Sequence, residues 1–452
     1  MITLRPYQNN TVDAARASFN AGNDCIVMSI PTGGGKTVIF SYIVLNNIRN
    51  EGRAMILCDR KELIEQAERN VANYGASATI IAPKHKMLKS NLYIASVDTL
   101  RNREFPEIDL LIVDEAHKQT FDPIIKKYKE LYPDLLVIGA TATPHRIGNQ
   151  ASMHEIYTDM IGTEVSIPFL LDEGFLVPEK TYAAKLDLSK VHMKGGDYDT
   201  QELFNIFDKK TLYDDAVGKY NRIAPGTKAI CFNVNVEHSM KMCEAFNAAG
   251  ISARHLEAKS KDRKELLKQF SRGEFQVLCN CSVLTTGYDE PSIETIILNR
   301  ATKSLSLYLQ MCGRGARLYP GKSNFKIIDM GSNVYEHGLW SEDREWNLEK
   351  KKKKNGAKGA AAKKICQSCS FINAISAKVC GDCGQEFPTK EGKLLEGEFE
   401  EVKKESFQKL DLKGMSLAQL HAVAKERGYK AGWAMRMHQV HRSKRNPVTF
   451  NK

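Results

Sequence analysis

The glycine-rich stretch over residues 24–37, DCIVMSIPTGGGKT, constrains the fold of this chain more than any other segment. An apolar run from Cys25 to Ile30 ends at Pro31, which is the pattern of a short buried strand. Three glycines, Lys36 and Thr37 follow, and the next residues, VIFSYIVLNNIRN, have the spacing of a helix. A strand, a glycine loop and a helix in this order predict a phosphate-binding loop.

The polar residues of this region fit a nucleoside triphosphate with Mg²⁺. Lys36 would reach the β- and γ-phosphates, and the Thr37 hydroxyl would hold Mg²⁺. Upstream, Gln8 can both donate to and accept from an adenine edge. Ile30 stands where the strict motif has a small residue, and a chance glycine turn is the alternative interpretation. The candidate ligands in the loop are Thr32, Gly33, Gly34, Gly35, Lys36 and Thr37.

Length and composition restrict the class of protein. At 452 residues the chain should contain more than one domain, and no apolar run is long enough for a transmembrane helix. The start, MITLRPYQNN, lacks the pattern of a signal peptide. Most of the 11 cysteines are scattered through apolar runs, which favours a reducing, cytoplasmic location. The net charge of +11 favours a polyanionic partner.

Polar residues also stand at the ends of the next two predicted strands. Residues 54–60 and 91–100 read as buried strands within βαβ units, so a parallel sheet is expected. Arg60, Ser96 and Thr99 lie at their ends, where open parallel sheets bind ligands. Helix capping is an equally good interpretation for each of the three taken alone.

Two adjacent acids end a further predicted strand, DLLIVDEAH, over residues 109–117. Asp114 would hold a metal ion, directly or through water, and Glu115 would accept a proton from an attacking water molecule. His117 could relay between the nucleotide and its surroundings. The alternative is that two acids simply end a strand in solvent. The glycine-lysine loop upstream favours the first interpretation, because it supplies the phosphates that such acids need.

A second α/β pattern follows the first. Residues 134–146 predict a further strand that opens into the small residues GATATP. The pattern loosens over 151–215, which we interpret as the passage between two domains. Strands and helices alternate again from TKAICFNV at 227–234 onward, without a second glycine-lysine loop. We therefore expect the second domain to complete a site that begins in the first.

The helix predicted over residues 304–318, SLSLYLQMCGRGARL, carries the groups for that completion. Gln310 and Arg314 are four residues apart, and Arg314 and Arg317 are three apart, which predicts that all three share one helical face. Two arginines on one face suit a γ-phosphate whose charge grows in a transition state. A solvated basic helix face is the alternative.

The order of these motifs resembles that of the superfamily 2 DEAH-box helicases and translocases. The matching segments run from residue 4 to 317: LRPYQ, PTGGGKT, DRKELIEQ, DEAH, TAT, VLTTGYDEP and QMCGRGAR. The resemblance implies an α/β fold with two tandem RecA-like domains, ATP hydrolysis between them and nucleic acid bound across both. SLSLYLQMCGRGARLYPGK, KIIDMGSN and a later cysteine module are most similar to RadD-type DNA helicases, and UvsW-like phage helicases are looser relatives.

The resemblance also implies roles for individual residues. Those that resemble the adenine contacts are Arg5 and Gln8, and those that resemble the phosphate and Mg²⁺ set are Lys36, Thr37, Asp114 and Glu115. The sensor and arginine-finger positions correspond to Gln310, Arg314 and Arg317. Residues in segments that touch the nucleic-acid backbone are Arg60, Ser96, Thr99 and Thr285. Gly287 and Asp289 fall in the segment that links this surface to the nucleotide.

A cysteine cluster near the C-terminus predicts a metal site. Cys366-x₂-Cys369 and Cys380-x₂-Cys383 can place four thiolates around one Zn²⁺ ion, and a closed four-cysteine shell would be structural. A redox pair or chance clustering is the alternative. The Lys-rich run over 350–364 fits a solvated linker as well as a phosphate contact.

These readings predict seven segments. They are helicase domain 1 over 1–150, a connection over 151–215, helicase domain 2 over 216–345, a Lys-rich linker over 346–365, a zinc ribbon over 366–388, a linker over 389–412 and a basic α-helical tail over 413–452. The tail fits a nucleic-acid or protein contact, or a plain helical hairpin.

The function that follows is an ATP-dependent motor on DNA that is single-stranded, forked or branched, acting in replication, recombination or repair. ATP, Mg²⁺ and structural Zn²⁺ are the expected cofactors, and single-strand-binding or recombination proteins are candidate partners. Three alternatives stay open: a translocase that does not separate strands, an RNA helicase, and a binding module that ATP merely switches. No membrane partner is expected.

Overall fold

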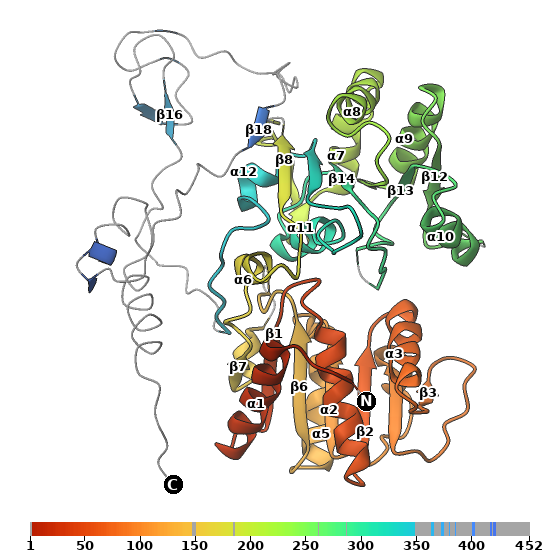
Figure 1. Cartoon of the computed structure of the whole chain (residues 1–452), viewed down its shortest axis with the longest axis vertical. Helices are drawn as coiled ribbons and strands as arrows, with labels where there is room; N and C mark the ends of the chain where they lie inside the picture. The colour runs from red at the N-terminus through yellow and green to blue at the C-terminus, as the bar shows by residue number, and fades with distance from the viewer. Residues whose placement is uncertain are drawn as a thin grey trace. The chain divides into compact units, whose positions relative to one another are not determined.

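The computed structural model describes residues 2–146, 151–183, 186–260, 262–285 and 287–348, with short pieces at 363–365, 372–374, 379, 385, 400–402, 416–417 and 419–421. The chain divides into two compact units, residues 1–402 and 403–452. The first unit contains two seven-stranded sheets, each covered by helices (Figure 1). We call the first sheet with its helices lobe 1 and the second sheet with its helices lobe 2.

Lobe 1 is built on a wholly parallel sheet with the strand order β3-β4-β2-β5-β6-β1-β7. The bounds of the strands are β1 Cys25–Ser29, β2 Ala54–Cys58, β3 Thr79–Ile81, β4 Leu92–Ser96, β5 Leu110–Asp114, β6 Leu136–Thr141 and β7 Asp159–Ile161. Because successive side chains of a strand point to opposite faces, a parallel sheet needs an apolar layer on each side. Ile26 and Met28 belong to one core cluster, and Val27 belongs to another.

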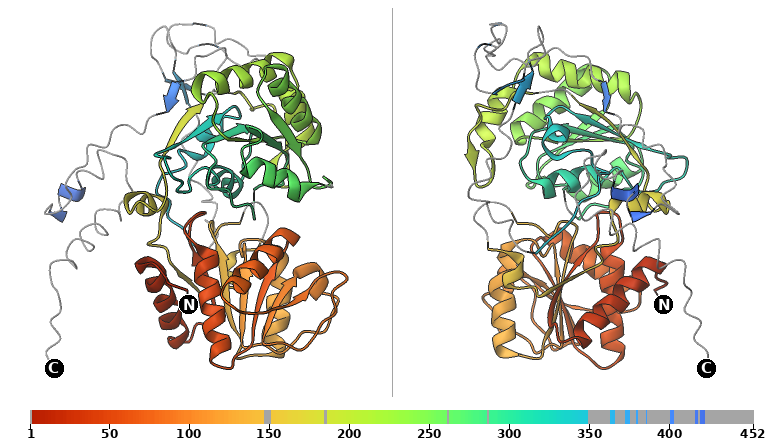
Figure 2. Two further views of the ribbon diagram at one scale, coloured as in Figure 1. Left: turned by 45° about the vertical axis from the view of Figure 1, so that its right-hand side comes forward. Right: turned by 90° about the vertical axis from the view of Figure 1, so that its left-hand side faces the viewer.

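Helices supply these two layers (Figure 2). The first face packs against α1 Pro6–Asn20, α2 Lys36–Arg49 and α3 Lys61–Asn73. The opposite face packs against α5 Asp122–Leu131 and the short helix α4 Val97–Leu100. Short 3₁₀ turns, η1 Gln119–Phe121 and η2 Met153–Glu155, flank α5 and β7.

Lobe 2 repeats this plan with the order β12-β13-β11-β14-β15-β8-β18, in which only β18 is antiparallel to its neighbour. The strands are β8 Glu179–Ala183, β11 Ala229–Asn233, β12 Ala253–Leu256, β13 Val277–Asn280, β14 Thr295–Asn299, β15 Phe325–Asp329 and β18 Glu400–Val402. One face carries α7 Thr200–Phe207, α8 Lys210–Ile223 and α9 Val236–Ala248. The other face carries α10 Arg263–Ser271 and α11 Leu305–Cys312.

The remaining elements are short. Helix α6 spans Ile167–Asp172 and α12 spans Asn333–His337, and two small antiparallel pairs join β9 Met193–Lys194 to β10 Asp197–Tyr198 and β16 Lys363–Ile365 to β17 Ile372–Ala374. In the part of the chain that the structure describes, no helix combines the length and the apolar character that crossing a membrane requires.

The structure differs from the sequence expectation in three places. Residues 151–215, expected as a connection, give one strand to each sheet, since β7 pairs with β1 at the edge of lobe 1 and β8 lies between β15 and β18 in lobe 2. The strand expected over 91–100 stops at Ser96, where its partner β2 also ends, and α4 follows. The helix expected over 304–318 ends at Cys312, so Arg314 and Arg317 lie in a turn rather than on its face. Gly313 and Gly315 explain this end, because glycine weakens a helix and a Cβ on Gly315 would collide with Phe325.

The chain returns to lobe 1 after the last parallel strand of lobe 2. The Arg344 guanidinium donates to four lobe 2 carbonyls, which belong to His337, Leu339, Trp340 and Glu342. Four residues later, the carbonyl of Leu348 accepts hydrogen bonds from Ser152 Oγ at 2.7 Å and His154 N at 3.3 Å in lobe 1. Residues 345–347 therefore join two anchored ends, and we call 344–348 the return segment.

Gly139 in β6 tests the packing of lobe 1. A Cβ at this position would lie 2.7 Å from Ala116 Cβ and from the Tyr157 ring, so Gly139→Ala should lower the free energy of unfolding by about 1–3 kcal/mol. Gly218 is the control, because it lies exposed in α8 with open space around a new Cβ. Gly218→Ala should stabilise by about 1 kcal/mol. Urea titration followed by circular dichroism measures both, and equal effects would contradict this account.

Candidate nucleotide-binding site

The loop after β1 has a backbone that only glycine adopts easily. Gly33 and Gly35 have φ values of +87° and +79°. A Cβ on Gly35 would lie 2.4 Å from Gln8 Nε2, and one on Gly33 would lie 2.7 Å from Leu176. The Tyr7 hydroxyl donates to the carbonyl of Gly34 at 3.0 Å, which fixes the loop to α1. Glycines are thus required here both by conformation and by space.

The two candidate adenine contacts lie beside this loop. Gln8 is buried next to Gly35, and its Oε1 accepts a hydrogen bond from the backbone N–H of Arg5 at 2.9 Å. The Arg5 guanidinium lies 4.3 Å from the centroid of the Phe175 ring, and Tyr7 also packs against that ring. Residues from α1 and from the segment after α6 therefore form one wall next to the glycine loop.

Lys36 and Thr37 begin α2 directly after Gly35. Lys36 Nζ donates to the carbonyl of Ile30 at 3.1 Å, so the side chain lies back over the loop. Burial lowers the pKa of Lys36, and Glu115 and Asp114 act in the opposite direction. A half-buried ammonium group at a helix N-terminus, beside glycine N–H groups, is an environment that favours a polyanion.

The two acids are at the end of β5, as expected. Burial raises the pKa of Asp114, and repulsion from Glu115 adds to this effect. Glu115 has a φ of +56°, a strained conformation for a residue with a side chain, and its N–H donates to Asp114 Oδ1 at 3.0 Å. The strained backbone turns the Glu115 carboxylate toward His117 and Gln310.

His117 and Gln310 place Glu115 in a network that crosses from lobe 1 to lobe 2. Gln310 Nε2 of α11 donates to Glu115 Oε2 at 3.2 Å. His117 Nδ1 lies 3.4 Å from the same oxygen and 2.9 Å from Thr141 Oγ1. Burial lowers the pKa of His117, which favours the neutral imidazole. Glu115 is therefore oriented from both lobes.

The arginines of lobe 2 are held by the loop that precedes them. Arg314 donates to the carbonyls of Tyr288 at 2.5 Å and Thr285 at 2.7 Å, and Arg317 forms an ion pair with Asp289. Burial lowers the pKa of Arg314 and of Arg317 to about 10, so both stay charged near neutral pH. Arg314 Nε is buried and has no hydrogen-bond partner among the described residues. A buried donor without a partner is unusual in a folded protein, which marks Arg314 as a candidate ligand contact.

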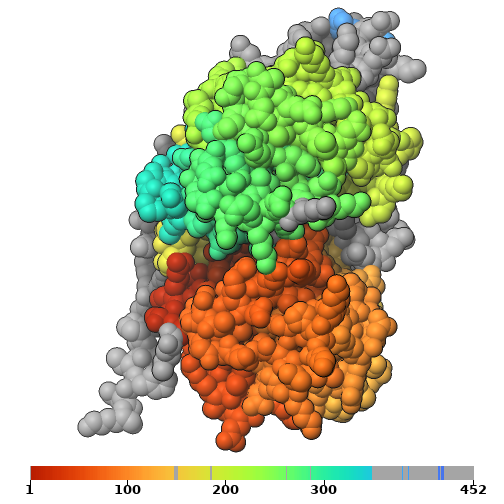
Figure 3. All heavy atoms as spheres, turned by 90° about the vertical axis from the view of Figure 1, so that its right-hand side faces the viewer, coloured from red at the N-terminus to blue at the C-terminus, as the bar shows by residue number. Residues whose placement is uncertain are grey.

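A cleft of about 250 Å³ brings most of the predicted residues together. From lobe 1 it is lined by Thr32, Gly33, Gly35, Lys36, Thr37, Asp114 and Glu115, and from lobe 2 by Gly287, Asp289, Arg314 and Arg317. Residues of both lobes also meet along one face of the molecule (Figure 3). Gln310 borders the cleft through Glu115, and Gln8 borders it through Gly35. The residues present fit a triphosphate with Mg²⁺, because positive φ glycines, a half-buried lysine, two arginines and an acid at a strand end line one space.

The four residues predicted to touch nucleic acid are not gathered in this cleft. Arg60 directly precedes α3 without a capping hydrogen bond from its side chain, and it donates to the carbonyl of Ser282 in lobe 2 at 3.4 Å. Ser96 ends β4 and Thr99 lies in α4, both half-buried at the same sheet edge as Arg60. Thr285 is buried beneath Arg314, so its side chain is far less accessible than the other three.

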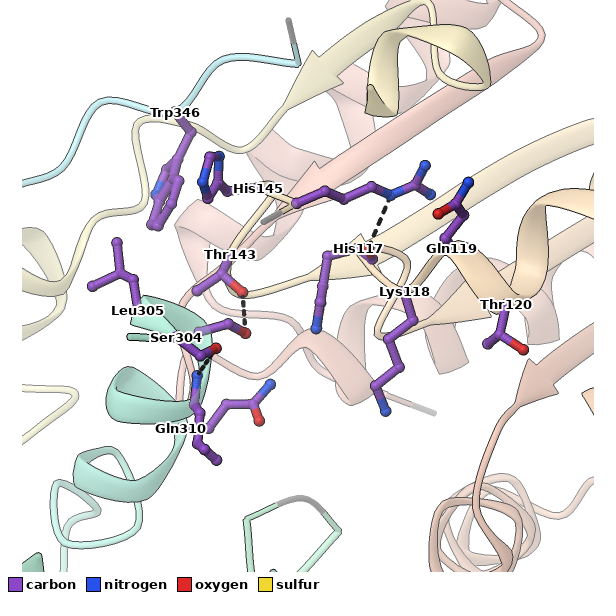
Figure 4. A pocket seen from close by; sticks show the side chains of 13 residues that line it. His117, Lys118, Gln119, Thr120, Thr143, His145, Ser304, Leu305, Gln310 and Trp346 are labelled. Carbon is purple, nitrogen blue, oxygen red and sulfur yellow. Dashed lines mark hydrogen bonds between the residues drawn. The ribbon is translucent and has the colours of Figure 1, made fainter. Parts of the chain in front are cut away.

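Some residues of the site carry no sequence signal of their own. Leu63, Gln66 and Asn70 of α3 line the cleft, but the amphipathic pattern of that helix explains them without a ligand. Thr143 Oγ1 lies 2.7 Å from Ser306 Oγ across the two lobes. Beside this contact, a second pocket of about 400 Å³ is lined by His117, Lys118, Gln310 and Trp346 among others (Figure 4). These contacts join segments that are far apart in the sequence, so the sequence alone does not identify them.

The predicted zinc ligands Cys366, Cys369, Cys380 and Cys383 lie outside the described residues, as do most of the Lys-rich linker and of the C-terminal tail. Within the described ranges, no group of three or more His, Cys, Asp or Glu side chains has the arrangement of a metal site. Mg²⁺ is commonly held through one or two carboxylates together with phosphate oxygens, so Asp114 does not need such a group.

Two family models match the chain, one on each lobe. The family described as "Type III restriction enzyme, res subunit" matches residues 1–146, and "Helicase conserved C-terminal domain" matches residues 209–319. Among solved structures, a fragment of an HsdR subunit of a type I restriction enzyme from Vibrio vulnificus has a similar fold, with a TM-score of 0.58 and 24% identity. That similarity covers 74% of this chain and 65% of the other.

Two curated relatives extend the comparison. A 51.5 kDa protein of a Lactococcus phage is 33% identical over 385 residues, which are 83% of this chain and 82% of the phage protein. A Saccharomyces cerevisiae protein named as an ATP-dependent helicase, IRC3, is 30% identical over 72% of this chain, which spans about half (51%) of that protein. With two helicase-type family models on its two lobes and relatives of this identity, the chain belongs to the superfamily 2 helicases.

Proposed function

We propose that this protein is an ATP-dependent motor that acts on DNA. The observation that carries the proposal is the cleft in which Lys36 and Glu115 of lobe 1 face Arg314 and Arg317 of lobe 2. A nucleotide bound there would touch both lobes, so its hydrolysis would change the contact between them. The family models named for a restriction enzyme subunit and a helicase support DNA as the substrate.

In the proposed reaction the chain positions and polarises the triphosphate. Glycine N–H groups and Lys36 bind phosphate oxygens, and Glu115 accepts the proton of the attacking water. Mg²⁺, when bound, neutralises phosphate charge, and Thr37 and Asp114 are the residues that would hold it. Arg314 and Arg317 stabilise the charge that develops on the transferred phosphoryl group. Gln8 and Arg5 bind the adenine.

The network around Glu115 provides the proposed link to movement. Gln310 contacts the catalytic carboxylate from lobe 2, and the Thr143–Ser306 contact lies beside it. Loss of the γ-phosphate removes the anion that Arg314 and Arg317 bind, which weakens the attraction between the lobes. The nucleic-acid backbone would then be held by Arg60, Ser96 and Thr99 while the lobes separate. Thr285 would contact the backbone once its loop has moved.

The finer assignments belong to this proposal. We infer a DEAH-box type enzyme close to RadD-type and UvsW-like helicases, working in the cytoplasm on DNA repair or recombination, with single-strand-binding or recombination proteins as partners. Cys366, Cys369, Cys380 and Cys383 form a structural zinc ribbon in this view. The alternatives are a translocase that leaves strands paired and an RNA helicase, and the family's ATPase chemistry argues against a mere binding module.

Lys36→Ala and Glu115→Gln test the catalytic centre. Lys36→Ala should abolish measurable ATP hydrolysis because the phosphates lose their cation. Glu115→Gln should lower kcat by about 10²–10⁴-fold while ATP binding persists. Both are measured by phosphate release, with ATP affinity from a fluorescent analogue. Normal turnover in Lys36→Ala would refute the assignment of this cleft.

Arg317→Ala tests the contribution of lobe 2. Because this arginine binds the γ-phosphate and stabilises the charge that grows on it in the transition state, the variant should lose about 10³-fold or more in kcat, with a smaller loss of ATP affinity. Arg272→Ala is the control, because Arg272 is an exposed arginine of the same lobe in ion pairs with Glu265 and Glu274. A variant Arg317→Ala with the turnover of Arg272→Ala would remove the arginine from the mechanism.

The nucleic-acid substrate can be identified by measuring how strongly each nucleic acid stimulates ATP hydrolysis. We expect forked DNA to stimulate hydrolysis more than single-stranded DNA, and RNA to stimulate least. A strand-displacement assay on the same fork separates a helicase from a translocase. Stimulation by RNA alone would replace the DNA proposal with the RNA alternative.

Zinc content tests the proposed ribbon. The purified protein should contain about one Zn²⁺ per chain, measured by atomic emission, because four thiolates complete a tetrahedral shell. Cys366→Ser combined with Cys369→Ser should lose the metal, whereas Cys243→Ser, which changes a cysteine of α9, should keep it. Full-length protein without zinc would exclude the ribbon.

A further inference from the structure

The loop after β3, residues 82–90, combines strong positive charge with high exposure. Lys84, Lys86 and Lys89 are all exposed, and none forms an ion pair with a residue that the structure describes. The surrounding sequence from residue 69 to residue 97 has no acidic residue at all. The charge of the loop is therefore not compensated by its neighbours along the chain.

The loop is held in a defined shape. The Arg103 guanidinium donates to the carbonyls of His85 at 2.8 Å and Ala82 at 3.4 Å. Ala82 and His85 close a turn in which Lys84 has a φ of +67°. At the other end of the loop, the N–H of Ser90 donates to the Tyr93 hydroxyl at 3.0 Å. Positive side chains on a braced backbone lose less entropy on binding than side chains on a free loop.

Strand topology places the start of the loop at the ligand-binding edge of lobe 1. All seven strands are parallel, so the loop after β3 begins at the same edge as Arg60 after β2 and Ser96 after β4. β3 is the outermost strand on this side, next to β4, and Figure 1 shows the loop at the outer side of the sheet. Arg103, which braces the loop, follows α4, the helix that contains Thr99. The loop therefore starts beside the predicted backbone contacts and, because β3 and β4 are parallel, then runs along the outer side of the sheet to the start of β4.

We propose that residues 82–90 bind the phosphate backbone of nucleic acid that extends beyond Ser96 and Thr99. Lys84 and Lys89 are five residues apart, so their Cα atoms lie at most about 17 Å from each other. A duplex carries roughly one negative charge per 1.7 Å, so three lysines over this length can each meet a phosphate. The inference rests on the proposed function, because it requires nucleic acid at this edge of lobe 1.

The test replaces the three lysines together. Lys84→Ala with Lys86→Ala and Lys89→Ala should weaken binding of labelled forked DNA by about 10-fold or more. The slope of log affinity against log salt should fall by about 2–3, since each lysine that contacts a phosphate contributes about one. Lys84→Arg with Lys86→Arg and Lys89→Arg keeps the charge and should retain most of the affinity. ATP hydrolysis without nucleic acid and the melting temperature should equal those of the wild type in both variants.

A matched triple variant controls for net charge. Lys190, Lys209 and Lys210 are exposed lysines of lobe 2, and their replacement by alanine removes the same charge far from the loop in sequence. An equal loss of affinity in this control, or no loss in the 82–90 variant, would overturn the inference. If the wild type bound no nucleic acid, the proposed function itself would fail, which is a separate outcome. Single-stranded and duplex probes show which form of DNA lies on the loop, and a loss with either supports the contact.

Discussion

The parallel direction of the strands is the constraint on which the site depends. In lobe 1 every strand runs the same way, so every loop that follows a strand emerges at one edge of the sheet. The glycine loop, the two acids and the small residues after β6 come from strands far apart in sequence, yet they meet because of this rule. In lobe 2 the arginine turn follows helix α11 rather than a strand, so this rule does not place it. The lobe 1 side of the candidate site thus depends on topology before it depends on individual side chains.

Burial then decides how these groups behave. Lys36, Arg314 and Arg317 are charged groups largely removed from water, and burial lowers the pKa of each. Removing charge from water costs free energy unless a partner of opposite charge is present. Three cations and two acids that are half-buried or buried in one cleft form an environment that favours a polyanion with a metal ion. The desolvated charges lower the stability of the protein without ligand, and a ligand of opposite charge can compensate this cost when it binds.

The sequence predicted the parts of this site that are encoded locally. The glycine loop and the acids at the end of β5 could be identified because each motif lies within a few consecutive residues whose neighbours define a strand or a helix. The return of Arg314 and Arg317 to the same cleft was also expected, but their place on a helical face was wrong. Two glycines follow the early end of α11. The spacing of the residues predicts a helix but does not predict at which residue the glycines end it.

Features that depend on distant contacts could not be predicted in this way. The edge strand β7 has only three residues, and its pairing with β1 makes it a strand. Leu63, Gln66 and Asn70 look like ordinary residues of an amphipathic helix until α3 is placed beside the glycine loop. The roles proposed for Arg60, Ser96, Thr99 and the four C-terminal cysteines stay predictions.

The return segment has a mechanical consequence. Between Arg344 on lobe 2 and Leu348 on lobe 1 there are only three residues, so the two anchor points can separate to no more than about 14 Å without breaking bonds. The return segment therefore sets a maximum separation between its two anchor points, in addition to the covalent connection before β8. A larger separation of the two anchor points would break the hydrogen bonds that Ser152 and His154 donate to the Leu348 carbonyl.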